Sequence, residues 1–118
     1  MRAKTIICDI DGVILTHLNA GMHSQLLDNP IALKGSVEKL SEWDRLGYNI
    51  ILLTGRRESS RKLTETYLEK LGIFYDQLVM GVGGGSRILI NDRKPNSQEN
   101  TAFAVNLTRN EGLKDVKL

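Results

Sequence analysis

The chain has 118 residues, of which 25% are charged, and its 16 basic residues exceed its 14 acidic ones by two. This length is sufficient for one domain with an apolar core, residues 1–118, and it is too short for two. The positive charges are scattered along the chain, which gives little support for a polyanionic partner and does not exclude a small phosphorylated one.

No segment approaches the roughly 20 apolar residues that a membrane span requires, so we expect no membrane partner. The N-terminal residues lead straight into a strand-like run, so we expect no secretory signal. The single cysteine, Cys8, cannot form an internal disulfide. These features favour a reducing, cytoplasmic location.

Residues 4–10 form a short, nearly continuous apolar run, which predicts a buried strand. The run leads into Asp9 and Asp11, and Gly12 follows. Because side chains alternate along a strand, both carboxylates leave the backbone on the same side and Cys8 points to the core. Carboxylates this close repel each other unless a cation or a shared proton compensates them. The pattern therefore indicates a divalent metal site, a nucleophile with its acid/base partner, or a merely structural Asp-Gly turn.

Residues 15–34 show no clean periodicity, and we expect a loop or flap there. Such loops often contact substrate above the ends of parallel strands. His17 and His23 lie in this segment and could reach a substrate. Neither has a cysteine or histidine partner at metal-binding spacing, so we expect no zinc site.

Helical spacing of apolar residues begins after Ser36, the predicted N-cap, and ends at Gly47. A second buried strand is predicted over residues 48–53, and the sequence Thr54-Gly55-Arg56 follows it. A second helix then ends at Gly72. The apolar faces of the two helices consist of Val37, Leu40, Trp43 and Leu46, and of Leu63, Tyr67, Leu68 and Leu71.

Residues 79–80, 88–90 and 102–107 are three further short strand candidates, and residues 108–118 form a polar tail that we expect at the surface. Residues 81–85 are rich in glycine but lack the Lys-Ser/Thr of a P-loop, which favours a flexible turn. The alternation of strands and helices predicts an α/β fold, Rossmann-like, with a mostly parallel sheet and flanking helices.

Polar residues follow three of the predicted strands. They are the pair Asp9 and Asp11, the pair Thr54 and Gly55, and Asp92, which follows Asn91. In an open α/β sheet such groups gather outside the carboxyl ends of the strands. Three carboxylates make an all-oxygen site suited to Mg²⁺, and a hydroxyl beside a backbone N–H suits a phosphate oxygen.

At this point the chain resembles the haloacid dehalogenase superfamily of phosphotransferases. Three apolar strands ending in Asp9-Ile-Asp11-Gly12-Val, in Thr54-Gly55-Arg56 and in Asn91-Asp92 are similar to its first, second and fourth motifs. Thr-Gly-Arg also resembles the phosphatase domains of polynucleotide kinases. The resemblance covers residues 4–107 and implies a sheet of order 5-4-1-2-3. Because residues 15–34 are too few for a folded cap domain, it also implies a minimal cap or none.

By this resemblance Asp9 is the nucleophile that becomes an aspartyl-phosphate, and Asp11 is the general acid and base. Asp9, the backbone carbonyl of Asp11 and Asp92 would hold Mg²⁺, with Asn91 as a water-mediated ligand. Thr54 and the Gly55 N–H would bind the phosphoryl oxygens.

The third family motif supplies a cation from a helix, and no such helix precedes residue 88 here. We assign this cation to Lys94, which follows Asp92, with Arg56 in reserve because it follows Thr54 closely. Arg87 lies at the far end of its predicted strand. Residues 81–87 form a taut link between the flanking strands, unless residues 77–80 form an edge piece or a hairpin with 87–91.

The sequence thus predicts an Mg²⁺-dependent phosphomonoester hydrolase that acts on a phosphorylated sugar or related small metabolite. Alternatives are a phosphatase for nucleic-acid ends, a phosphomutase, and a non-catalytic binding or scaffold domain. The lack of an aromatic stacking surface disfavours nucleic acid. A homo-oligomer could cover an active site that has no cap.

Overall fold

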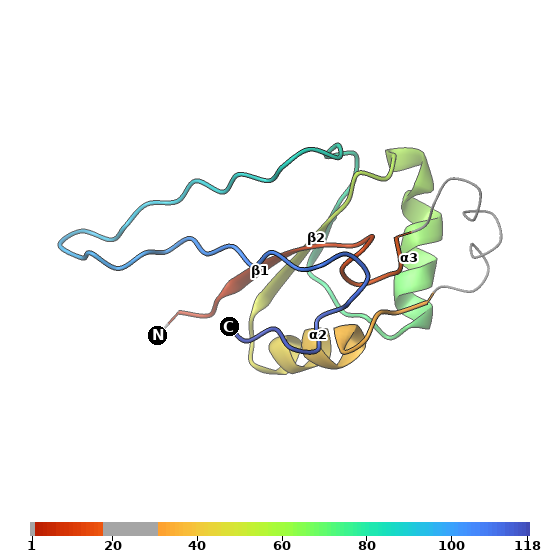
Figure 1. Cartoon of the computed structure of the whole chain (residues 1–118), viewed down its shortest axis with the longest axis horizontal. Coiled ribbons are helices and arrows are strands. Elements are labelled where there is room, and N and C mark those ends of the chain that lie inside the picture. The colour runs from red at the N-terminus through yellow and green to blue at the C-terminus, as the bar shows by residue number, and fades with distance from the viewer. Residues whose placement is uncertain (1, 18–30) are drawn as a thin grey trace.

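The centre of the molecule is a parallel three-stranded sheet (Figure 1), seen in a computed structural model that describes residues 2–17 and 31–118. The strands are β1 (Thr5–Asp9), β2 (Asn49–Leu53) and β3 (Gln77–Val79), in the order β1-β2-β3. Residue Asp9 lies beside Leu53, so β1 and β2 end at the same level. The predicted α/β fold with parallel strands is confirmed.

Two helices connect the strands, α2 (Ser36–Arg45) and α3 (Arg61–Lys70), and a short 3-10 turn, η2 (Glu58–Ser60), precedes α3. Of the residues predicted for their apolar faces, Leu40 and Tyr67 are buried, whereas Leu46 and Leu63 are 57% and 41% exposed. Trp43 of α2 and Leu68 of α3 are buried, as is Cys8 of β1. Gly47 and Gly72 follow the two helices with positive φ, as expected for C-terminal caps.

The N-cap of α2 is Gly35 rather than the predicted Ser36. Ser36 is fully buried, and its hydroxyl donates to the carbonyl of Val13 over 3.1 Å. This serine therefore ties the start of α2 to the loop after β1 instead of capping the helix.

The strand predictions for residues 88–90 and 102–107 are wrong, because neither segment forms a strand. Residues 83–104, here named the arm, leave the body and return toward it as two extended limbs (Figure 1). The molecule is consequently 53 Å long but only 29 × 25 Å across. The side chains of Ile88 and Ile90 are 84% and 89% exposed. Apolar residues become a strand only when their backbone pairs, and these have no partner in the described chain.

Residues 108–118 do not form the surface tail that the sequence predicts. Leu113 and Val116 are buried in the core. The tail reaches the body at Gly112 and Gly35, where the N–H of Lys114 donates to the carbonyl of Lys34 over 3.1 Å. The three apolar residues of this polar segment, Leu113, Val116 and Leu118, are too few to show a periodicity, and so the sequence did not reveal this contact.

The predicted flap, residues 15–34, lies partly outside the described residues, and so does His23. Its two described ends lie together: the N–H of Thr16 donates to Ile31 and that of Leu33 to Ile14, over 3.3 and 2.7 Å. Among the described residues, no helix is long and apolar enough to cross a membrane.

Candidate active site

Asp9 and Asp11 lie at the carboxyl end of β1, where the chain turns at Gly12 with φ of 91°. Both side chains are partly exposed, whereas Ile10 between them is fully buried, as strand alternation requires. The N–H of Ile10 donates to Oδ1 of Asp9 over 2.9 Å. This bond fixes one oxygen of the partly exposed carboxylate.

The guanidinium of Arg56 binds both carboxylate oxygens of Asp11. Its Nη2 and Nε donate to Oδ1 and Oδ2 over 2.7 and 2.9 Å. Its Nη1 donates a third hydrogen bond, to the hydroxyl of Thr64 on α3, over 3.0 Å. The side chains of Arg56 and Asp11 are only 17% and 27% exposed. This paired geometry is the strongest that arginine makes with a carboxylate, and it fixes the orientation of both groups.

Thr54 directly follows β2 and is fully buried. Its hydroxyl accepts the N–H of Arg56 over 3.0 Å, so it orders the turn that presents the arginine. Its backbone N–H and carbonyl bind Val79 and Val82 over 3.0 and 3.1 Å. A phosphoryl oxygen would reach the covered hydroxyl only after this turn opened, whereas Gly55 is exposed.

The predicted glycine-rich turn passes close to Gly55. A Cβ at this position would come within 3.0 Å of the carbonyl oxygen of Gly83. Arg87 closes the turn, because its guanidinium donates to the carbonyls of Gly83 and Gly85 over 2.8 and 2.9 Å. The turn is therefore held by its own arginine and packed against the end of β2.

Asp92, Asn91 and Lys94 lie on the arm, and the structure does not bring them to Asp9 and Asp11. The side chain of Asp92 is 73% exposed and pairs with Lys94 over 3.5 Å. The amide of Asn91 donates to the backbone and hydroxyl of Thr101, both over 3.2 Å. Within residues 2–17 and 31–118, no three acidic, histidine or cysteine side chains form a metal-binding group.

Two residues of the site were missed by the sequence reasoning, Thr64 and Asn110. Thr64 is fully buried and binds Arg56. Asn110 binds the loop after β1: its N–H donates to Gly12 over 2.8 Å, and its side-chain oxygen accepts the N–H of His17 over 2.6 Å. Neither has a motif around it. They take part in the site only because α3 and residues 108–118 fold close to it.

The donor atoms of this site fit Mg²⁺ in kind. Magnesium prefers oxygen ligands and is commonly held by one or two carboxylates together with water and substrate phosphate. The carboxylate of Asp9 and the backbone carbonyl of Asp11 supply oxygens of this type. A second carboxylate ligand is supplied only if Asp92 reaches the end of β1.

No protein-family model and no curated protein matches the chain. Among solved structures, it is similar to a chain of the Pnkp1/Rnl/Hen1 RNA repair complex, at 29% identity with a TM-score of 0.57, over 73% of this chain and 30% of that one. It is also similar to a D,D-heptose 1,7-bisphosphate phosphatase from B. bronchiseptica, complexed with magnesium and phosphate. There the identity is 26% and the TM-score 0.51, over 69% of this chain and 51% of that one.

A protein from Vibrio cholerae, 20% identical, shares the fold with a TM-score of 0.53 over 75% of this chain and 79% of its own. The chain thus spans about a third to a half of the length of the two similar proteins named above. The parallel α/β sheet agrees with the fold of these structures. Its structural neighbours are phosphatases of the haloacid dehalogenase superfamily, and the chain has a fold and a size consistent with a small phosphatase of that type.

Proposed function

We propose that the chain is an Mg²⁺-dependent phosphomonoester hydrolase in which Asp9 is the nucleophile. The observation that carries this proposal is the joining of two strand ends by one ion pair, Asp11 after β1 and Arg56 after β2. Carboxylates, a guanidinium and an exposed backbone N–H, that of Gly55, then lie at one edge of the sheet. The similarity to a magnesium- and phosphate-bound phosphatase supports the same chemistry.

In the first step an oxygen of Asp9 attacks phosphorus, the bond from phosphorus to the ester oxygen breaks, and Asp11 gives its proton to the leaving oxygen. Asp11 then removes a proton from water, which attacks the aspartyl-phosphate and releases inorganic phosphate. Asp9 is restored. Bound Mg²⁺, held by Asp9, the carbonyl of Asp11 and Asp92, would offset the negative charge of nucleophile and substrate.

Arg56 acts first on Asp11, because it occupies both oxygens of that carboxylate. Asp11 is paired as a carboxylate, so it can give a proton to the leaving oxygen only after this ion pair opens and the carboxylate takes up a proton from water. An incoming phosphoryl anion competes for the guanidinium, and this competition can release Asp11 when substrate arrives. Arg56 then binds a phosphoryl oxygen together with the N–H of Gly55 and, once its turn opens, the hydroxyl of Thr54.

Lys94 is proposed as the second phosphoryl-binding cation, on the condition that the arm brings it to the site. Its neighbour Asp92 is the proposed metal ligand, and the two already pair. A Lys94→Met protein should bind Mg²⁺ as the wild type does and lose most of its activity. Full activity in that variant would remove Lys94 from the mechanism.

A small phosphorylated sugar or related metabolite is the substrate class that we favour. The second candidate is a phosphorylated nucleic-acid end, because the chain is similar at 29% identity to part of an RNA repair complex. The two are separated by phosphate release from a panel of sugar phosphates and 3′- or 5′-phosphorylated oligonucleotides with Mg²⁺. At least tenfold higher kcat/KM for one class assigns the substrate. Absence of release from every member of the panel would favour the non-catalytic binding domain.

A further inference from the structure

One side of β1 has no partner strand. In the described part of the chain, β1 pairs with β2 alone, and it is therefore an edge of the sheet. Ile7 on this strand is 46% exposed. An exposed parallel edge with apolar side chains is a template for a further strand.

The arm carries a segment that matches this edge. Ile88 to Asp92 is a five-residue run that ends in an aspartate, as does Thr5 to Asp9 of β1. Three neighbouring apolar side chains in it, those of Ile88, Leu89 and Ile90, are 84%, 54% and 89% exposed. Monomeric proteins seldom leave such contiguous apolar surface uncovered.

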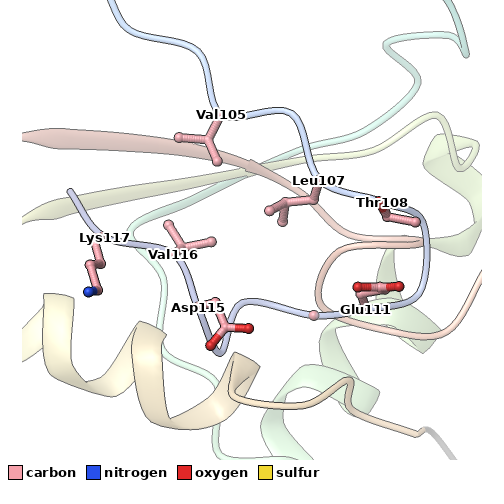
Figure 2. A pocket seen from close by; sticks show the side chains of 8 residues that line it. Val105, Leu107, Thr108, Glu111, Asp115, Val116 and Lys117 are labelled. Carbon is pink, nitrogen blue, oxygen red and sulfur yellow. The ribbon is translucent and has the colours of Figure 1, made fainter.

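A parallel pairing in which Ile88 lies beside Thr5 also places Asp92 beside Asp9. The two aspartates then leave the sheet on the same side, because both are the fifth residue of their segment. This is the juxtaposition that the metal site lacks in the single chain. A hollow of about 220 Å³ is lined by Val105, Leu107 and Val116 together with polar residues such as Thr108, Glu111 and Asp115 (Figure 2).

Within one chain, the arm reaches its own β1 in this register only if the link to Ile88 is fully extended. Val82 is fixed by its N–H to the carbonyl of Thr54, at the end of β2. Six Cα–Cα steps, about 20 Å when fully extended, connect Val82 to Ile88. To lie beside Thr5, Ile88 must be displaced by two strand spacings of ~4.8 Å across the sheet and by ~17 Å back along the strands. The straight-line distance is therefore about 20 Å, and this line passes through the sheet itself.

The link is also folded rather than extended. Gly83 has φ of 75°, and the guanidinium of Arg87 holds the carbonyls of Gly83 and Gly85. The two limbs of the arm are joined near its tip by further bonds, such as that from Arg93 to Asn100 over 3.0 Å. These bonds hold the arm in a course that leads away from the body of its own chain, where it can contact another molecule.

We propose that two copies of the chain exchange arms, so that residues 88–92 of each copy add as a parallel strand to β1 of the other. Asp92 of one copy then completes the aspartate site of its partner. Exchange of an identical element between protomers is a known low-cost route to a closed dimer. The contribution of Asp92 to catalysis rests on the proposed function, whereas the exchange itself does not.

A mixture of two inactive variants tests the shared site. Asp9→Asn and Asp92→Asn chains should each be inactive, and mixing them after mild unfolding and refolding should restore about a quarter of the wild-type activity. Half of the random dimers are mixed, and each mixed dimer holds one intact site. If the wild type is active and the mixture stays inactive, the shared site is wrong.

Disulfide cross-linking tests the exchange without reference to activity. Neighbouring strands lie at a separation that a disulfide can span, so a Thr5→Cys/Ile88→Cys chain should oxidise to a dimer of twice 13.2 kDa on a non-reducing gel. In the control, Thr5→Cys/Leu89→Cys, the second thiol faces the other side of the sheet, and at least fivefold less dimer is expected. An intrachain disulfide, or thiols that stay free, would overturn the proposal. Cross-linking reports on the exchange of arms even if the protein has no phosphatase activity.

Discussion

Arg56 binds Asp11 through two parallel hydrogen bonds of 2.7 and 2.9 Å, although 45 positions separate the two residues in the sequence. The pair links the end of β1 to the end of β2. Thr64 of α3 accepts from the remaining nitrogen of the guanidinium, and the N–H of Arg56 is bound by Thr54. Arg56 is therefore fixed from three elements and serves as the organising cation of the described site.

Replacing Arg56 by lysine should separate geometry from charge. Lysine keeps the positive charge but cannot form two parallel bonds to Asp11 and a third to Thr64. We expect kcat/KM for a phosphomonoester to fall at least tenfold, which is about 1.4 kcal/mol of transition-state stabilisation. The matched control is Arg57→Lys, since Arg57 is exposed and adjacent. Equal rates in the two variants would show that the Arg56–Asp11 pair is structural only.

Gly112 should be essential for attaching residues 108–118 to the body. A Cβ at this position would lie 2.3 Å from the carbonyl oxygen of Lys34, and the backbone has φ of 83°. We expect Gly112→Ala to lower the free energy of unfolding by about 2–4 kcal/mol, measured by urea denaturation. Gly84→Ala is the control, because a Cβ at Gly84 meets nothing within 4 Å. A loss of stability as small as that of the control would contradict the observed close approach.

Leu113 should contribute to the core in spite of its polar surroundings in the sequence. It is 3% exposed and belongs to the same cluster as Ile10 and Leu40. We expect Leu113→Ala to cost about 2–4 kcal/mol of unfolding free energy through lost burial and a cavity. Leu118→Ala, at a leucine that is 50% exposed, should cost less than ~0.5 kcal/mol. Similar values for the two variants would place residues 108–118 at the surface after all.

Cys8 should react with alkylating reagents only when the protein opens. Burial, together with the neighbouring negative charge of Asp9, raises the pKa of this thiol from 9.0 to about 12. The unfolded thiol loses its proton from about pH 9, so the stability linked to this group is complete below pH 9 and is lost as the pH rises toward 12. At pH 8.5 we expect iodoacetamide labelling to be at least 100-fold slower in the native than in the urea-unfolded protein, followed by mass spectrometry. Comparable rates would contradict the buried position.

Local patterns predicted the parts of the fold that are specified locally. The apolar runs before Asp9 and Thr54 became β1 and β2, and the glycines Gly47 and Gly72 ended the two helices where expected. Each of these features depends on residues that are near neighbours in the sequence. The presence of carboxylates at the end of β1 follows from strand alternation in the same way.

The remaining features depend on contacts between distant segments. Residues 88–90 have the composition of a strand, but a strand also requires a backbone partner, and composition does not say whether one lies in reach. The pairing of Arg56 with Asp11 and the ties of Asn110 to Gly12 and His17 are of the same kind. The roles assigned to Lys94 and Asp92 remain predictions that the Lys94→Met and Asp92→Asn variants address. Those assigned to Thr54 and Gly55 also remain predictions.

The most direct measurement of the central claim is the rate of p-nitrophenol release from p-nitrophenyl phosphate by the wild type and by Asp9→Asn, each with Mg²⁺ and with a chelator. Asparagine keeps the size of the side chain and removes the nucleophilic carboxylate. We expect release by the wild type with Mg²⁺, loss of release with the chelator, and a rate at least ~1000-fold lower for Asp9→Asn. No release by the metal-loaded wild type, or equal rates for the two proteins, would contradict the account.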